Sequence, residues 1–109
     1  MRNLAQLLKG NTDFLLLSLL QGEPMYGYQM IKELERRSER FFRLGEGTMY
    51  PALHRLERSG LVQGRWERLP NGQERRYYSL TRKGERGLEE QAKAWARFAT
   101  AVDMIVRPT

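Results

Sequence analysis

Apolar residues recur at helical spacing in several stretches of the chain, and the clearest of these is residues 46–58. An α-helix there, turning about 100° per residue, gathers its apolar side chains on one face. These are Met49, Ala52, Leu53 and Leu56. The opposite face then holds small and basic residues, namely Gly47, Pro51, His54, Arg55 and Arg58. Such a helix suits a DNA groove, although a solvated surface helix has the same pattern.

Two further helices are predicted before this one. Residues 13–21 are apolar almost all round, which indicates a helix packed on several sides, with Thr12 as its N-cap. The Gly-Glu-Pro sequence at 22–24 ends it. Residues 26–38 predict the second helix, whose inner side holds Tyr28, Ile31 and Leu34. Gly27 stands between two tyrosines, which indicates close packing of its backbone against a neighbour.

After Gly60 the pattern changes from helical spacing to alternation. Residues 61–68 and 74–80 alternate in character and contain several aromatic side chains, so each predicts a β-strand. The sequence LPNGQ at 69–73 contains strong turn formers and completes a β-hairpin. Because an isolated hairpin is marginal in water, one face of it must pack on the helices. The candidates for this contact are Val62, Trp66, Tyr78 and Leu80.

The last predicted helix covers residues 82–106, with Thr81 as its N-cap and Pro108 preventing its continuation. Its apolar residues alternate in spacings of four and three, as in a coiled-coil seam: Leu88, Ala92, Trp95, Ala99, Val102 and Val106. At roughly 35–40 Å this helix is longer than so small a domain can cover, so part of its apolar face requires a second subunit. We expect the dimer interface to combine this stripe with Leu4 and Leu7 of a short N-terminal arm. The alternative for this arm is to pack on its own domain.

These elements together predict an α+β fold, mostly α. Three helices, a hairpin and a long helix follow the order of a winged helix-turn-helix DNA-binding domain with a C-terminal dimerisation helix. Residues 1–80 would form the winged domain, with 1–10 as the N-terminal arm and 61–80 as the wing. Residues 81–109 would form the dimerisation helix. In this architecture the third helix enters the major groove and the wing lies against the backbone or the minor groove.

Composition narrows the function. The 109 residues carry a net charge of +6, which favours a polyanionic partner. Cysteine is absent and His54 is the single histidine, so neither a metal site nor a cofactor is expected. The longest apolar run, residues 14–17, is too short to cross a membrane, and the chain is expected to be soluble and cytoplasmic. We find no catalytic constellation and predict that the protein is not an enzyme.

Two separated motifs carry a family resemblance. They are GTMYPALHRLE at 47–57, followed by Gly60-Leu61, and RRYYSLTRKG at 75–84. Together they resemble the signature of PadR-type transcriptional regulators, in the short form with a single C-terminal helix. The resemblance implies a repressor that is dimeric through its first and last helices, binds inverted-repeat operators in double-stranded DNA and responds to small, flat or phenolic effectors. It also maps the groove-facing helix onto 46–58, where Gly45 replaces the serine cap usual in the family.

The expected DNA contacts fall on this helix and on the wing. Arg55 points outward from mid-helix and either reads a guanine edge, clamps a phosphate or pairs with an acid. Thr48 and Tyr50 are better placed for phosphates, and Tyr50 is equally compatible with a half-buried core position. The predicted set is Thr48, Tyr50, Pro51, His54, Arg55 and Arg58 on the helix, and Arg68, Asn71, Gly72, Arg75 and Arg76 on the wing. Alternation lets only one of Arg75 and Arg76 share a face with Tyr77.

An effector site is predicted around Trp95, which lies mid-way along the coiled-coil stripe. Two copies near a dimer axis could stack on a flat aromatic ligand, with Phe98, Leu8 and Asp103 as neighbours, or Trp95 simply fills the interface. Two other functions remain open. One is a winged-helix module that binds a protein, and the other is a ligand-binding dimer with little DNA affinity.

Overall fold

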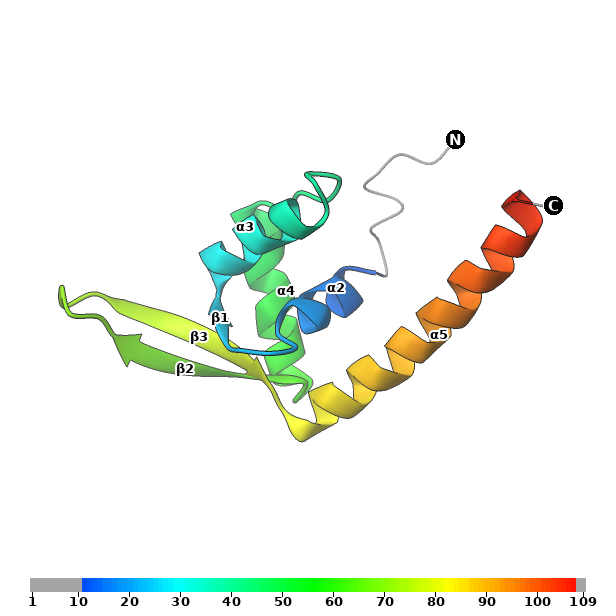
Figure 1. Cartoon of the computed structure of the whole chain (residues 1–109). Helices are drawn as coiled ribbons and strands as arrows, with labels where there is room; N and C mark the ends of the chain where they lie inside the picture. Colours follow the sequence, from blue (N-terminus) through cyan, green and yellow to red (C-terminus); the bar gives the residue numbers. More distant parts are fainter. Residues whose placement is uncertain (1–10, 108–109) are drawn as a thin grey trace.

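The computed structural model describes residues 11–107. Within this range the chain forms four helices and three strands (Figure 1). In chain order they are α2 (Thr12–Leu19), β1 (Met25–Tyr26), α3 (Gly27–Arg37), α4 (Glu46–Arg58), β2 (Val62–Arg68), β3 (Glu74–Leu80) and α5 (Arg82–Val106). Three helices followed by a hairpin confirm the prediction of a mostly helical winged helix-turn-helix fold.

The core lies where α2, α3 and α4 meet the base of the hairpin. The inner face of α4 is the predicted one, with Met49, Ala52, Leu53 and Leu56 buried. In α3 the buried residues are Gly27, Met30, Ile31 and Leu34, whereas Tyr28 is 50% exposed and its predicted inner position is wrong. Each three-residue step turns a helix by about 300°, so a series of such steps drifts around the axis and leaves Tyr28 off the buried face.

Helix α2 begins one residue earlier than predicted. Thr12 is its first residue and Asn11 occupies the N-cap position, so the prediction of Thr12 as the cap is wrong. Asp13 nevertheless lies in the first turn, where the positive end of the helix dipole favours a carboxylate. At α5 the predicted cap is confirmed, because the Thr81 hydroxyl accepts a hydrogen bond of 3.0 Å from the Gly84 N–H.

The strands form one antiparallel sheet in the order β1-β3-β2. Strands β2 and β3 are the predicted hairpin, with Val62 opposite Leu80 and Trp66 opposite Arg76. Strand β1 adds a short edge through the pairing of Met25 with Tyr78. Two residues are too few for an alternation pattern, which is why the sequence did not predict this strand.

The hairpin packs on the helices only at its base. Val62 and Tyr78 are buried and Leu80 is partly buried against the same core. Trp66 shares their face of the sheet but is 61% exposed, so its predicted contact with the helices is wrong. The residue lies farther along the hairpin, beyond the base that packs on the core.

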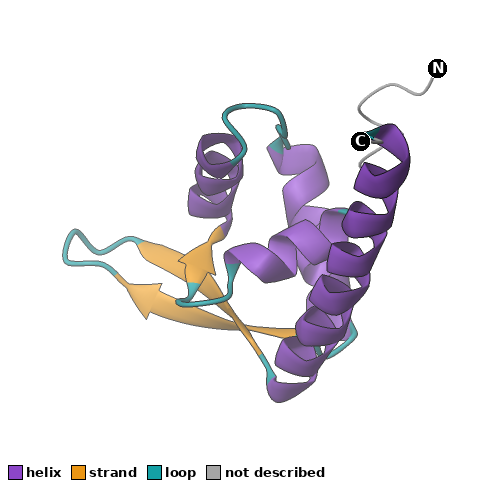
Figure 2. Cartoon of the chain, turned by 45° about the vertical axis from the view of Figure 1, so that its right-hand side comes forward, coloured by secondary structure: helices purple, strands orange, loops and turns teal. Residues whose placement is uncertain are grey.

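The wing and α5 leave the helical body on opposite sides (Figures 1 and 2). At the start of α5, Gly84 and Leu88 are buried, whereas from residue 89 to 107 the helix is exposed except for a half-buried Ala99. The described part of the chain is therefore long and narrow, with extents of 58 × 28 × 21 Å. No helix within residues 11–107 is both long and apolar enough to cross a membrane.

Candidate nucleic-acid interface

The outer face of α4 is open along its whole length. Pro51, His54 and Arg58 are exposed and, with Glu57, line a shallow hollow on the solvent side. Thr48 is exposed one turn nearer the start of the helix. Gly45 occupies the N-cap position and supplies no side-chain cap, as its identity predicts.

Arg55 is engaged in an ion pair. Its Nη2 donates a hydrogen bond of 2.6 Å to Oδ1 of Asp13 in the first turn of α2. Both side chains are still substantially exposed to solvent. Pairing with an acid was one of the roles left open for Arg55, and such an exposed pair stabilises a fold by about 0.2–1 kcal/mol. The guanidinium is thus held at the surface, within reach of solvent.

Tyr50 is half-buried and packs against the core rather than pointing straight out of α4. Its ring lies against the backbone of Gly27 at the start of α3, where an added Cβ would be only 2.5 Å from the ring. This contact confirms the close backbone packing predicted for Gly27. Tyr50 therefore fixes the distance between α3 and α4, whatever its phenol also contacts.

The tip of the wing is a closed turn. The Gly72 N–H donates to the Leu69 carbonyl at 2.9 Å, and Gly72 has a φ of +87°, which favours glycine. The Asn71 side chain accepts a hydrogen bond of 3.0 Å from the Gln73 N–H and stabilises the turn from within. Arg68, at the end of β2, is exposed beside this tip.

Arg75 and Arg76 lie on opposite faces of β3, as alternation predicted. The Arg75 guanidinium lies 4.4 Å from the centroid of the Tyr26 ring, and Tyr26 in turn meets Tyr77 edge to face at 5.4 Å. The Arg76 guanidinium turns back towards α4 and donates a hydrogen bond of 2.6 Å to Glu57. Glu57 raises the pKa of Arg76, while burial raises the pKa of the neighbouring Tyr78 phenol.

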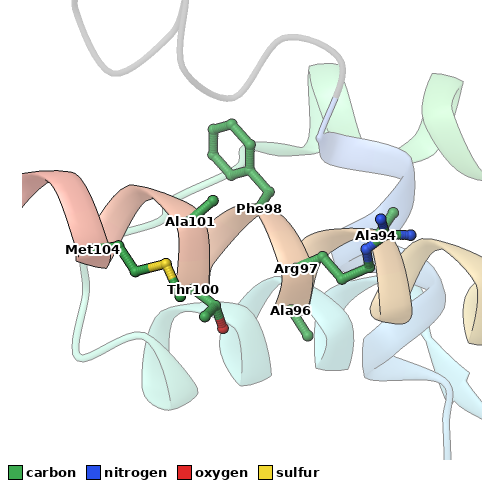
Figure 3. Close-up of a pocket in the computed structure, with 7 residues that line it drawn as sticks. All are labelled: Ala94, Ala96, Arg97, Phe98, Thr100, Ala101 and Met104. Atoms are coloured by element: carbon green, nitrogen blue, oxygen red, sulfur yellow. The ribbon is translucent and has the colours of Figure 1, made fainter.

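The predicted effector residues are only partly brought together. Trp95 and Phe98 are 51% and 61% exposed, and their ring centroids are 5.8 Å apart. Asp103 is exposed and lies 3.8 Å from Arg107. A surface depression beside Phe98 is lined by α5 residues alone, and Figure 3 shows Phe98 standing away from the helix. Leu8 lies outside the described residues.

The predicted dimer stripe is exposed except at its start. Leu88 is buried in the core of its own chain, which leaves little of it for a second subunit. The remaining members lie on the uncovered part of α5, with Ala99 half-buried and the others exposed: Ala92, Trp95, Val102 and Val106. Leu4 and Leu7 lie outside the described residues.

Several polar partners escaped prediction from sequence. Asp13 is the partner of Arg55, and Glu57 is the partner of Arg76. In addition, Nζ of Lys83 donates a hydrogen bond of 2.8 Å to the carbonyl of Ser59, the residue after α4. The two residues of each pair are distant in sequence, so no local spacing indicates these hydrogen bonds. Within residues 11–107 we find no group of three or more histidine, aspartate or glutamate residues arranged to hold a metal ion.

Comparisons with known proteins agree with this geometry. The model of the transcriptional regulator PadR-like family matches residues 16–90. A PadR-like transcriptional regulator from Bacillus cereus has a similar structure, with a TM-score of 0.84, 31% identity and coverage of 95% of this chain and 99% of that one. A transcriptional regulator of Mycobacterium tuberculosis is 36% identical over 72% of this chain and 69% of its own length.

A more distant structure carries nucleic acid. Bacillus subtilis PadR, solved in complex with operator DNA, is 22% identical with a TM-score of 0.69, and the match covers 74% of this chain and 46% of that one. At this identity the likeness concerns the fold. The family match over 16–90 spans the second half of α2, all of α3 and α4, the wing and the start of α5. The chain therefore belongs to the PadR-like family of transcriptional regulators, which are not enzymes.

Proposed function

We propose that this protein is a transcriptional repressor that binds inverted-repeat operators in double-stranded DNA as a homodimer. The observation that carries the proposal is the exposed outer face of α4, with His54 and Arg58, together with the exposed Arg68 on the wing. A net charge of +6 favours the approach of this surface to DNA. The operator complex of Bacillus subtilis PadR supports the same use of the fold.

The side chains would divide the work. On DNA, Arg55 exchanges Asp13 for a guanine edge, a bidentate contact worth about 1–3 kcal/mol of discrimination. Thr48 and the Tyr50 phenol contact phosphates, which fix the register without reading the sequence. In the wing, Arg68 and Arg75 face the backbone, while the tight turn at Asn71 and Gly72 lets the tip approach it closely. The wing residues add affinity more than specificity.

Dimerisation would bury the apolar face of α5. Trp95, Phe98, Val102 and Ile105 are all exposed in the single chain, an unusual concentration for a monomer of this size. Pairing of two such helices about a twofold axis covers this face and sets two copies of α4 at a fixed separation. Half-sites one helical turn apart would match that separation.

The same interface would contain the effector site. Two Trp95–Phe98 pairs near the axis present flat aromatic faces, and a planar ligand stacked between them favours one arrangement of the two subunits. If that arrangement no longer matches the half-sites, the operator is released. Sensing by Trp95 fluorescence tests this step directly, using a planar aromatic dye and a Trp66→Phe background that removes the second tryptophan.

A gel-shift assay tests the central proposal. The full-length chain, first shown to be a dimer by sedimentation, is incubated at low salt with the DNA upstream of its own gene. The proposal is supported if the DNA is retarded and if unlabelled specific competitor, but not bulk DNA, removes the retardation. Arg55→Ala should then relax the sequence preference. A confirmed dimer that retards no DNA would refute it. Binding to a protein partner with little salt dependence would instead favour an interaction module.

A further inference from the structure

One carboxylate connects the end of α4 to both strands of the wing. Oε2 of Glu57 accepts a hydrogen bond of 2.6 Å from Nη2 of Arg76 on β3. The same oxygen accepts a second one, of 3.2 Å, from the backbone N–H of Gly64 on β2. Strand β2 lies at the edge of the sheet, where a backbone N–H that points away from β3 has no partner strand. The Glu57 carboxylate supplies a partner for one such N–H, that of Gly64. We call the group of Glu57, Gly64 and Arg76 the wing clasp.

The guanidinium of Arg76 fits this place closely. Its Cζ lies 5.6 Å from the centroid of the Trp66 ring and 5.8 Å from that of Tyr78, within the range of a cation–π contact with each. It also lies flat on Gly64, where an added Cβ would come within 2.5 Å of its Nε. Any side chain at position 64 would therefore displace it. Both charged partners of the clasp are about 30% exposed, which shields their pairing from full solvent screening.

We propose that Glu57 and Arg76 are positioning residues that set the angle between the recognition helix α4 and the wing, and that Arg76 does not itself contact phosphate. This inference rests on the proposed DNA-binding function. Its physical basis is that α4 and the hairpin are otherwise joined mainly through the base of the sheet, where Val62 and Tyr78 are buried. The clasp adds a polar link beside this base, since Gly64 lies opposite Tyr78 and Arg76 lies two residues farther along β3 towards the tip. A change of angle at the clasp is therefore carried along the hairpin to the tip of the wing.

The clasp also separates the arginines of the wing by role. Glu57 already neutralises the charge of Arg76, so Arg76 does not add to the number of counterions released when DNA binds. Arg68 is exposed at the tip, and no side-chain partner is described for it within residues 11–107. Arg68 should therefore contribute to the salt dependence of binding and Arg76 should not.

The test uses two variants that open the clasp without changing the net charge, Gly64→Ala and the double variant Glu57→Gln/Arg76→Gln. Gly64→Ala should fold, because the atoms it displaces are the far end of a flexible side chain. Arg68→Gln serves as the comparison. The probe is a fluorescent duplex of about 30 base pairs, selected from a random library by the wild-type chain and long enough for two half-sites. Affinity is measured by anisotropy between about 50 and 200 mM KCl.

We expect both clasp variants to bind DNA about tenfold more weakly at every salt concentration. This is the change in affinity expected when DNA must orient a wing that one charged hydrogen bond no longer holds. The slope of log K against log [KCl] should stay at the wild-type value for both, whereas Arg68→Gln should reduce it by about 0.9. If the double variant reduces the slope as Arg68→Gln does, Arg76 is a phosphate contact and the proposal fails. Unchanged affinity of both clasp variants also overturns it.

A second measurement needs no DNA. In NMR spectra of the free chain, the single variants Glu57→Gln and Arg76→Gln should both shift the Gly64 amide and the Trp66 indole signals, and Arg68→Gln should leave them in place. If neither clasp variant moves these signals, the clasp does not exist in solution. If the wild-type chain binds no duplex at all while the shared shifts are present, the proposed function fails and the clasp stands as a contact that orients the wing.

Discussion

The junction between the wing and α5 offers a sharp test of the packing. Gly84, in the first turn of α5, lies directly on the backbone of Leu61, and a Cβ added to it would come 2.0 Å from the Leu61 carbonyl oxygen. An ordinary carbon–oxygen contact needs about 3.3 Å or more. The substitution Gly84→Ala therefore forces α5 and the strand entry apart by about 1.3 Å, because a backbone oxygen cannot turn aside.

The expected loss follows from what shares that junction. The Leu61 carbonyl accepts a hydrogen bond from the Thr81 N–H at 3.1 Å, and the Thr81 hydroxyl donates to the Gly60 carbonyl at 2.6 Å. Each such bond contributes about 0.5–1.5 kcal/mol, and the steric overlap costs about 1–3 kcal/mol. Alanine regains about 1 kcal/mol of helix propensity. Gly84→Ala should therefore lower the free energy of unfolding by about 1–5 kcal/mol.

Gly87 supplies the matched control, because a Cβ there would meet only Leu61 Cδ2 at an ordinary 3.9 Å. Gly87→Ala should raise stability by up to about 1 kcal/mol through helix propensity alone. In thermal unfolding followed by circular dichroism, Gly84→Ala should lower Tm by roughly 4–20 °C and Gly87→Ala should raise it by about 4 °C. All samples need the same protomer concentration, since dimers gain stability by mass action. Equal increases for both variants would refute the contact with Leu61.

Three further substitutions test single interactions. Thr81→Ala should cost about 1 kcal/mol in unfolding experiments by removing the cap of α5, and Thr81→Ser should restore most of it; equal losses would argue against the cap. Hydrogen bonds from Arg36 and Arg37 lower the pKa of Glu33 from 4.5 to about 2, so its stabilising contribution is present above pH 4.5 and is lost as the pH falls towards 2. An NMR titration should give that midpoint, and Arg36→Ala should raise it; an unmoved midpoint would contradict this cause. Asp13→Asn should free Arg55 and increase affinity for duplex DNA about two- to fivefold in anisotropy titrations, and a decrease would show that the pair presents Arg55 correctly.

The parts of the fold that sequence predicted are those with a local pattern. The buried face of α4, the strands on either side of the turn at 69–73 and the Thr81 cap each follow from spacing or residue type within a few positions. The pair of Asp13 with Arg55 spans 42 residues and that of Glu57 with Arg76 spans 19. No periodicity relates such positions, because their meeting depends on how whole elements are oriented.

The candidate site shows the same division. Alternation correctly placed Arg75 and Arg76 on opposite faces of β3. It could not tell that the Arg76 face turns back onto α4, or that Trp66 lies beyond the packed base of the hairpin. Both outcomes depend on the three-dimensional path of the wing relative to the helices. The choice between core and surface for Tyr50 likewise required the position of Gly27.

The direct connection of β3 to α5 through Thr81 has a mechanical consequence. With 25 residues, α5 is a lever about 37 Å long, so a rotation of about 5° at its base corresponds to a displacement of about 3 Å at its far end. Thr81 holds the base of α5 in place, since its hydroxyl hydrogen-bonds both the Gly60 carbonyl and the Gly84 N–H. A displacement of several ångströms at the far end of α5 would thus correspond to a rotation of only a few degrees next to the end of α4. If the proposed effector site on α5 exists, side-chain contacts at its exposed half would be enough to change the orientation of the proposed DNA-binding surface.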